Sequence, residues 1–328
     1  MRGEKMDWKK STILITGGTG SFGRKFVEIM LNKYKPRKLI VFSRDEFKQH
    51  QMRLEFSSNR LRFFVGDVRD GSRLRRALSG VDLVVHAAAL KQIPSCEYNP
   101  FEAVMTNIFG AKNVIDACID CGVKKIMALS SDKAVSPSNL YGATKLCAEK
   151  IFVQGNAYVG RASTRFSCVR YGNVIGSRGS VVEVFQKQKP QGVLTITDPR
   201  MTRFWIGLEQ GVEFVIHCIE EMKGGEIFVP KLPSMKTIDL AKAIAPECKI
   251  KYTGIRPGEK LRETLITEDE SRHAVELSDS FIIEPENPVW DYKPRKKGRR
   301  LAEGFSYSSD INDEWISPGA IRKMAAKL

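Results

Sequence analysis

The chain has 328 residues, of which 42% are hydrophobic, and a formal net charge of +15 at pH 7. This length predicts one main domain with a smaller second lobe, and the hydrophobic content is enough to bury a sizeable core. Its apolar runs are shorter than the ~18 residues of a membrane-spanning helix, and its start lacks the apolar segment of a signal peptide, which argues against a membrane protein. Seven cysteines without regular spacing fit reduced thiols in a cytoplasmic protein, and four histidines lack the spacing of metal ligands, so we expect no metal.

A glycine-rich turn follows the first predicted strand. Residues 11–16 form a short β-branched run, the turn spans 17–23, and a helical pattern follows. Strand, glycine turn and helix form the context of a dinucleotide-binding fingerprint, in which the glycines permit a tight turn and a close approach of backbone amides to a pyrophosphate. The predicted cofactor contacts in this turn are Gly17, Thr19, Gly20, Ser21, Phe22 and Gly23.

The tip of the second predicted strand bears on the choice of cofactor. The strand over 38–42 ends at Ser43, followed by Arg44 and, one helical turn on, Lys48. NAD-binding proteins usually place a carboxylate at this tip to hold the ribose 2′-hydroxyl. A hydroxyl and two cations suit a 2′-phosphate instead, so NADP is favoured, while Asp45 and Glu46 leave NAD as the alternative.

Further strands predict the fold. Runs at 62–65, 83–86 and 125–129 alternate with helical stretches, which predicts an α/β protein with a Rossmann-type, doubly wound parallel sheet. Ligands in such sheets lie beyond the carboxyl ends of the strands, where Asp67, Val68, Ala87 and Ala88 are expected to contact the cofactor. We expect a nucleotide-binding domain over 1–172, with a returning segment near 204–230, and over 173–328 mainly a substrate-binding lobe and a C-terminal extension.

Tyr141 and Lys145 lie four residues apart in a predicted helix, and therefore on the same face. A lysine ammonium in that position can stabilise a phenolate, so that a tyrosine with an ordinary pKa of about 10 can accept a proton near neutral pH. Such a base suits the oxidation of a secondary alcohol by a nicotinamide. The adjacent Asp132 and Lys133 follow the strand over 125–129 and place an oppositely charged pair just upstream of this helix.

The second half contains cationic and amide donors for a phosphorylated ligand. A polar, glycine-rich loop spans 171–181, Arg203 stands beside two aromatic residues, and Arg256 and Glu259 flank a turn. Two arginines from distant segments can clamp a diphosphate. The basic run 293–300 supports a different hypothesis, nucleic-acid binding, although the net charge also suits attraction of an anionic nucleotide-sugar.

These features together resemble the extended short-chain dehydrogenase/reductases, and most closely the inverting UDP-N-acetylglucosamine 4,6-dehydratases of bacterial pseudaminic-acid synthesis. The resemblance runs from about Thr12 to Ile283. It rests on the motifs above and on the segments 43–46, 66–70, 86–91, 132–134, 141–145, 170–181, 201–205, 225–230 and 256–260.

The resemblance implies a reaction in which C4 of the sugar is oxidised, water is eliminated across C5 and C6, and hydride returns to C6 with inversion at C5. The product is a UDP-2-acetamido-2,6-dideoxy-4-keto-L-hexose, used for pseudaminic acid and flagellin glycosylation. The implied catalytic residues are Asp132, Lys133, Tyr141 and Lys145, without a decision on which of the first two is acid and which is base. A UDP-sugar epimerase, a retaining dehydratase and a non-catalytic NADP-binding, nucleic-acid-binding regulator are the alternatives.

The resemblance also implies ligands and partners. NADP is the cofactor, UDP-N-acetylglucosamine the substrate, and the protein forms a homo-oligomer in which dimers assemble into a hexamer. Lys91, Asn107, Tyr141 and Lys145 join the cofactor contacts. The implied substrate contacts are Lys91, Ser131, Asn173, Ser177, Arg178, Ser180, Val181, Thr195, Met201, Arg203, Arg256 and Glu259.

Overall fold

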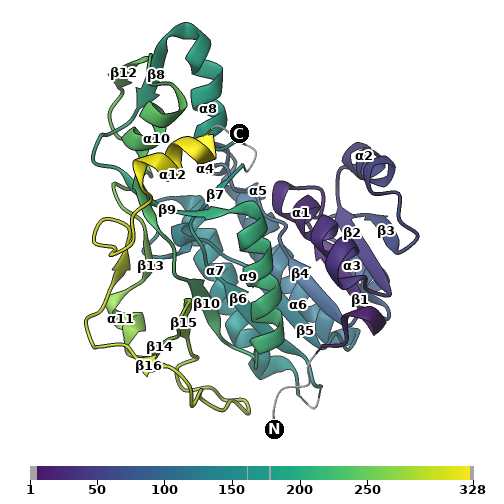
Figure 1. The fold of residues 1–328 in the computed structure, drawn as a ribbon. Helices are drawn as coiled ribbons and strands as arrows, with labels where there is room; N and C mark the ends of the chain where they lie inside the picture. The colour runs from purple at the N-terminus through teal and green to yellow at the C-terminus, as the bar shows by residue number, and fades with distance from the viewer. Residues whose placement is uncertain (1–5, 161, 177–178, 326–328) are drawn as a thin grey trace.

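A ten-stranded sheet forms the centre of the computed structural model, which describes residues 6–160, 162–176 and 179–325 (Figure 1). Its parallel strands follow the order β3 (Leu61–Val65), β2 (Lys38–Ser43), β1 (Thr12–Thr16), β4 (Leu83–His86), β5 (Lys125–Leu129), β6 (Arg165–Val169) and β10 (Ile227–Pro230). The chain order reverses between β1 and β4, which is the switch point at which such sheets bind ligands. The predicted α/β, doubly wound fold is therefore confirmed.

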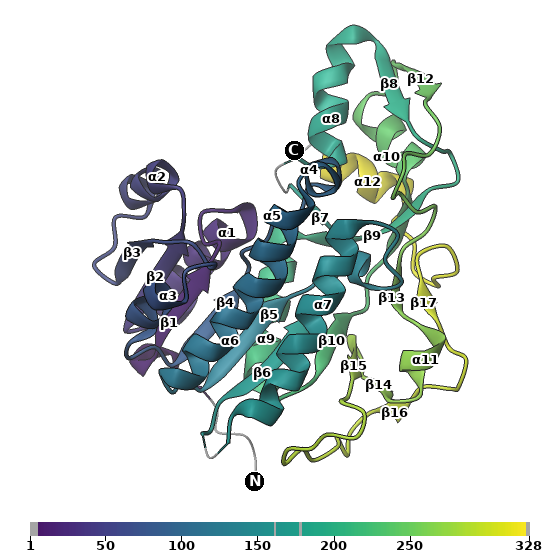
Figure 2. The ribbon, with the colours of Figure 1, turned by 180° about the vertical axis from the view of Figure 1, so that it is seen from behind.

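Helices cover both faces of the sheet, which explains why every residue of β1 is buried and apolar or β-branched. One face carries α1 (Ser21–Ile29) and α9 (Leu208–Glu221), which contact each other. The other face carries α3 (Gly71–Leu78), α6 (Gly110–Asp120) and α7 (Leu140–Gln154), as Figures 1 and 2 show.

Further helices lie between these elements along the chain. They are α2 (Glu46–Phe56), which contacts β2 and β3, and α4 (Ile93–Tyr98) and α5 (Pro100–Val104), which precede α6. Across the described part of the chain, no helix has both the length and the apolar character needed to span a membrane.

A smaller lobe lies beyond the carboxyl ends of the parallel strands (Figures 1 and 2). It has its own apolar core, which includes Phe185, Leu194, Trp205 and Leu240. Its elements are β7 (Asn173–Ile175), α8 (Val181–Gln188), β8 (Val193–Ile196), β9 (Thr202–Gly207), β11 (Ser234–Lys236), α10 (Thr237–Ile244), β12 (Lys249–Tyr252) and α12 (Pro318–Ala325). The chain therefore leaves the main sheet after β6, builds part of this lobe, and returns to the sheet with β10.

Antiparallel strands extend the main sheet past β10. They are β15 (Ser280–Ile283), β14 (Ala274–Glu276) and β16 (Arg299–Arg300), and β16 belongs to the basic run 293–300. Arg295, Arg299 and Arg300 each contact a glutamate of this region, at 3.5, 2.6 and 2.8 Å. Three of the six cations in the basic run therefore have acidic partners, which weakens the nucleic-acid hypothesis.

A buried ion cluster joins the sheet to the segment over 264–271. Arg170 follows β6, is fully buried, and pairs with Glu149 of α7 and with Glu270 of α11 (Glu268–Ser271) at 2.9 Å. Its guanidinium also donates a hydrogen bond of 2.8 Å to the carbonyl of Leu265 in β13 (Thr264–Ile266), which pairs with β17 (Tyr307–Ser308). These contacts fix β13 next to the sheet.

Candidate active site

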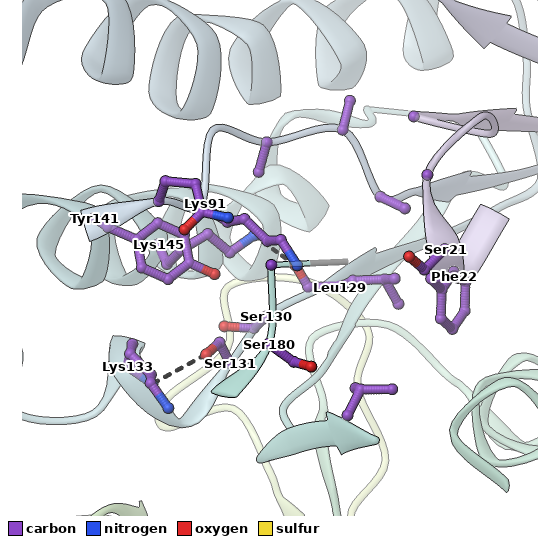
Figure 3. A pocket seen from close by; sticks show the side chains of 18 of the residues that line it. Ser21, Phe22, Lys91, Leu129, Ser130, Ser131, Lys133, Tyr141, Lys145 and Ser180 are labelled. Carbon is purple, nitrogen blue, oxygen red and sulfur yellow. Dashed lines mark hydrogen bonds between the residues drawn. The ribbon is translucent and has the colours of Figure 1, made fainter. Parts of the chain in front are cut away.

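A cleft of about 790 Å³ lies between the carboxyl ends of the parallel strands and the second lobe. Figure 3 shows Ser21 and Phe22 at one end of this space and Lys133, Tyr141 and Lys145 toward the other. All four predicted catalytic residues line the cleft, Asp132 included. The predicted cofactor contacts that line it are Gly17, Thr19, Gly20, Ser21, Phe22, Gly23, Ser43, Arg44, Lys48, Asp67, Val68, Ala87, Ala88, Lys91, Tyr141 and Lys145.

The glycine turn between β1 and α1 is shaped for a close approach of backbone. Gly17 has φ of 65°, and a Cβ atom there would come within 2.8 Å of the Ala88 amide nitrogen. Gly20 is the N-cap residue of α1 and has no side chain to occupy the helix start. The positive end of the helix dipole and its first amides therefore border the cleft, which suits an anionic pyrophosphate.

The tip of β2 presents the expected hydroxyl and cations. Ser43 Oγ accepts a hydrogen bond of 3.0 Å from Gln49, and Arg44 lies 3.7 Å from Asp67 with half of its side chain exposed. Asp45 caps α2 by accepting from the Lys48 amide at 2.9 Å, and it pairs with the Lys48 ammonium at 2.5 Å. The Asp45 carboxylate is therefore already engaged by its own helix.

Asn107 is the one predicted cofactor contact outside the cleft lining of the described residues. It is buried, and its side chain holds the Leu90 backbone by accepting from the Leu90 amide at 2.8 Å and donating to the carbonyl at 2.9 Å. Asn107 therefore supports the loop that carries Lys91. Similarly, Thr16 Oγ1 accepts from the amides of Ala87 and Ala88, both at 3.2 Å, which holds the loop after β4.

Tyr141 and Lys145 project from α7 into the cleft, as the four-residue spacing predicts (Figure 3). Burial raises the pKa of Tyr141 well above its usual range, the charge of Asp132 raises it further, and the Ser131 hydroxyl opposes both. The Lys145 ammonium donates a hydrogen bond of 2.5 Å to the Leu129 carbonyl at the end of β5. Burial lowers the pKa of Lys145, so its charge depends on such contacts.

Asp132 and Lys133 form a single turn directly after β5, and both side chains face the cleft. The Lys133 ammonium lies 2.8 Å from Asp132, 3.0 Å from the side-chain oxygen of Asn173, and 3.3 Å from Glu263. Burial alone would lower the pKa of Lys133, but the two carboxylates outweigh burial and raise it. Burial raises the pKa of Asp132, against the opposing charge of Lys133.

The predicted substrate contacts fall in the cleft and in a smaller adjoining cavity. Those that line the cleft are Lys91, Ser131, Asn173, Ser180, Val181, Arg203 and Glu259. The adjoining cavity has a volume of about 250 Å³ and includes Thr195, Met201 and Arg256. Ser177 and Arg178 lie outside the described residues. The two spaces share Arg203 and Trp205, so a ligand larger than the sugar can extend from one into the other.

The two arginines expected to clamp a diphosphate differ in their surroundings. Arg203 donates hydrogen bonds to the carbonyls of Lys260 and Leu261, at 2.8 and 3.1 Å, and its side chain is 12% exposed. Arg203 therefore fixes the loop after Arg256 as well as facing the cleft. Arg256 is 63% exposed, with Glu259 4.0 Å away.

Sequence reasoning missed Ser130, Trp205 and Glu263. Each lines the cleft and is more than nine-tenths buried, and the Ser130 hydroxyl has no hydrogen-bond partner among the described residues. Ser130 directly precedes the predicted Ser131, and Trp205 belongs to the segment 201–205 that contains Arg203. Only their position next to predicted residues could have identified them from the sequence. Glu263 lies beyond the recognised turn at 256–260, without a local pattern to mark it.

Known proteins share this sequence over most of its length. The model of the polysaccharide biosynthesis protein family matches residues 13–285. The inverting UDP-N-acetylglucosamine 4,6-dehydratase of Campylobacter jejuni serotype O:23/36 (strain 81-176) is 54% identical over 93% of this chain and 94% of its own length. The UDP-glucose 4-epimerase of Rickettsia canadensis is 43% identical over 83% of this chain and 82% of its own length.

Solved structures share its fold. Pen from Bacillus thuringiensis superimposes with a TM-score of 0.90 at 40% identity, covering 98% of both chains. The dTDP-glucose 4,6-dehydratase DesIV of Streptomyces venezuelae, solved with NAD and TYD bound, has a TM-score of 0.68 at 21% identity, covering 76% of this chain and 86% of its own. The chain therefore belongs to the polysaccharide biosynthesis protein family of extended short-chain dehydrogenase/reductases, together with the inverting UDP-N-acetylglucosamine 4,6-dehydratases.

Proposed function

We propose that this chain is an NADP-dependent UDP-N-acetylglucosamine 4,6-dehydratase that inverts C5. The observation that carries the proposal is the meeting of two acid–base pairs in one cleft, Tyr141 with Lys145 and Asp132 with Lys133. Oxidation at C4 needs only the first pair, whereas elimination across C5 and C6 needs a second acid and base. The Campylobacter jejuni relative supports the same reaction.

The residues of the cleft fit a nicotinamide dinucleotide. The turn at Gly17 leaves room only for backbone, the start of α1 favours a pyrophosphate, and the buried Ser130 hydroxyl offers an unused polar group. Within that cleft, the nicotinamide would accept hydride from C4 and return it to C6, without net oxidation. Tyr141 and Lys145 would border its ring.

Tyr141 is the residue suited to accept the proton of the sugar 4-hydroxyl. Because burial raises its pKa, its phenolate requires positive charge nearby. Lys145 supplies such a charge one helical turn away, and the Leu129 carbonyl fixes its ammonium in place. The Ser131 hydroxyl, which lowers the pKa of Tyr141, is the second stabilising group.

Asp132 and Lys133 are placed for the elimination. A C4 ketone acidifies the neighbouring C5 proton, and the C6 hydroxyl needs a proton in order to leave as water. Lys133 is charged at rest because two carboxylates raise its pKa, so it is ready to donate a proton and must lose one before it acts as a base. Asp132 lies on the same side of the cleft and completes the pair.

Incubation with UDP-N-acetylglucosamine, followed by NMR of the product, tests this proposal. The expected product has a 6-methyl group, a 4-ketone and inverted C5. An unchanged 6-hydroxymethyl group contradicts the dehydratase proposal. Retention at C5 contradicts only inversion and supports the retaining dehydratase.

A UDP-sugar epimerase is the second candidate, because the Rickettsia canadensis relative is named as a UDP-glucose 4-epimerase. An epimerase uses the same tyrosine and lysine but does not eliminate water. Its product would be an epimer at C4 or C5 that keeps the 6-hydroxyl. Asp132 and Lys133 favour the dehydratase, since epimerisation at C4 includes no elimination of water that would need a second acid and base.

NADP is proposed over NAD on the basis of Ser43, Arg44 and Lys48. All three line the cleft at the tip of β2, and Asp45 is engaged as the cap of α2. The half-exposed Arg44 guanidinium can bind a 2′-phosphate, and Lys48, which pairs with Asp45, adds a further cation nearby, whereas a ribose 2′-hydroxyl calls for an unengaged carboxylate.

The non-catalytic, nucleic-acid-binding alternative predicts strongly salt-dependent binding to DNA or RNA. The ion pairs of Arg295, Arg299 and Arg300 reduce the charge available for phosphates. A gel-retardation assay at low salt tests the alternative, and a lack of retardation removes it.

We further propose a cytoplasmic homo-oligomer that supplies pseudaminic-acid synthesis, with dimers assembling into a hexamer. Tyr98 of α4, Phe101 of α5, and Met105 and Phe109 of the helical segment before α6 are 87, 81, 42 and 49% exposed. A second copy of the chain would cover these exposed apolar side chains. Analytical ultracentrifugation tests the oligomer.

The chain divides, in this proposal, into a nucleotide-binding domain over 1–172, with a returning segment near 204–230, and a substrate-binding lobe over 173–328.

A further inference from the structure

Glu263 reaches the cleft from a segment that lies outside the main sheet. It stands directly before β13, and its side chain is only 3% exposed although it lines the cleft. Its backbone is held on both sides, because its amide donates to Ser309 Oγ at 3.0 Å and its carbonyl accepts from the Ser309 amide at 2.8 Å. The adjacent β13 is anchored by Arg170 through the Leu265 carbonyl. The carboxylate therefore has a fixed position.

The Glu263 carboxylate adds a second negative charge beside the Lys133 ammonium. The ammonium is 2.8 Å from Asp132, 3.0 Å from Asn173 and 3.3 Å from Glu263. Its hydrogen bonds go to Asp132 and Asn173, and Glu263 adds an ion pair from a third segment. Removal of any one of these partners leaves the lysine freer to rotate and less stabilised as a cation.

The charges around Glu263 also depend on its carboxylate. Its first oxygen lies 3.3 Å from Lys133 and 3.8 Å from Arg203 Nε, and its second lies 3.4 Å from the Lys260 ammonium. With Asp132, two carboxylates thus face three cations. Without Glu263, a single carboxylate would face all three, in a site sheltered from water where such repulsion is weakly screened.

We propose that Glu263 is a positioning residue for the elimination step, which fixes the Lys133 ammonium beside Asp132 and keeps it charged. This inference rests on the proposed dehydratase function and extends it to a residue that acts through Lys133. The Lys133 pKa, raised by Asp132 and Glu263 against burial, agrees with the geometry. Glu263 itself has a lowered pKa, because its cations outweigh its burial.

The test is the pH dependence of kcat for Glu263→Gln. Glutamine keeps the size of the side chain and removes its charge, so the pKa of Lys133 should fall. The limb of the kcat profile that Lys133 controls should move to lower pH by about 1 to 3 units. This direction holds whether Lys133 works as acid or base, because both limbs report the same pKa.

Two further variants separate charge from shape. Glu263→Asp keeps the charge and shortens the side chain. The Lys133 limb of its kcat profile should therefore return toward the pH of the natural protein, while kcat itself stays reduced. Lys260→Met removes a cation that pairs with Glu263 at 3.4 Å and competes with Lys133 for its charge, so the Lys133 limb of the kcat profile should move in the opposite direction, to higher pH. The matched control is Glu284→Gln, which removes another buried, ion-paired carboxylate far from the cleft and should leave the limb in place.

Lys133 can also be titrated directly, by mass spectrometry of its acetylation at a series of pH values. This measurement needs no turnover, so it tests the inference even if UDP-N-acetylglucosamine is not converted, a result that would contradict the proposed function alone. A lower pKa of Lys133 in Glu263→Gln supports the inference. An unmoved pKa, an equal shift in Glu284→Gln, or a shift to lower pH in Lys260→Met overturns it.

Discussion

The ammonium nitrogen of Lys133 lies 2.8 Å from a carboxylate oxygen of Asp132, whose side chain is 1% exposed. The charge of Asp132 also reaches Tyr141, whose pKa it raises. The proposed oxidation base and the proposed elimination pair are therefore electrostatically linked. A change at one is expected to alter the protonation of the other.

Replacing Tyr141 with phenylalanine should abolish turnover, because the phenolic oxygen is the proposed acceptor of the 4-hydroxyl proton. General acid–base groups typically contribute about 10²–10⁴-fold, so the rate of product formation should fall by at least that order. The matched control is Tyr158→Phe, at a tyrosine that is 78% exposed, which should keep full activity. Substantial turnover by Tyr141→Phe would assign the oxidation base to another group.

Replacing Lys133 with methionine should allow the first hydride transfer but block elimination. The stalled protein should accumulate reduced cofactor, visible by near-ultraviolet absorbance, together with a 4-keto sugar. Turnover should fall by about 10²–10⁴-fold, and solvent deuterium should no longer enter C5. Lys112→Met, at an exposed lysine on α6, serves as the control. Normal turnover with normal exchange at C5 would show that Lys133 only neutralises Asp132.

Replacing Arg44 with alanine should narrow the preference for NADP over NAD. A charge-assisted phosphate contact is worth about 1.5–3 kcal/mol, so the affinity for NADP should fall roughly tenfold or more. Affinity for NAD should change little, since NAD lacks the 2′-phosphate. Titration of both cofactors, with the exposed Arg76→Ala as control, measures the effect. Equal affinity of the unaltered protein for the two cofactors contradicts the NADP assignment.

Replacing Glu270 with glutamine should destabilise the fold in a pH-dependent way. Burial alone would raise the pKa of Glu270, but the charge and hydrogen bonds of Arg170 outweigh burial and lower it. A lowered carboxyl pKa contributes stability above the unfolded value of about 4.3, and this contribution is lost as the pH falls through the folded value. Breaking one partner of a buried ion pair costs about 3 kcal/mol at neutral pH.

Urea unfolding of both proteins at several pH values measures this effect. The gap in unfolding free energy between Glu270→Gln and the natural protein should be full near neutral pH and should shrink under acid. A gap that stays constant down to about pH 3 would show that the residue acts through packing and not through its charge.

The sequence by itself determined the parts of this protein that depend on local patterns. The strand, glycine turn and helix at Gly17 to Gly23 follow from residue types at short spacing, because a tight turn and a helix start need only neighbours in the chain. The shared face of Tyr141 and Lys145 follows from helix geometry. The position of Asp132 and Lys133 at the end of β5 follows from the topology of parallel sheets.

The tertiary structure alone decided which distant groups surround those residues. Glu263 is 130 positions from Lys133 in sequence, and it reaches the cleft because Arg170 and Ser309 hold the start of β13 in place. The sequence likewise did not predict that Arg203 donates hydrogen bonds to the carbonyls of Lys260 and Leu261. Burial and charge compensation are properties of the folded surroundings, so they set protonation states that no local pattern encodes.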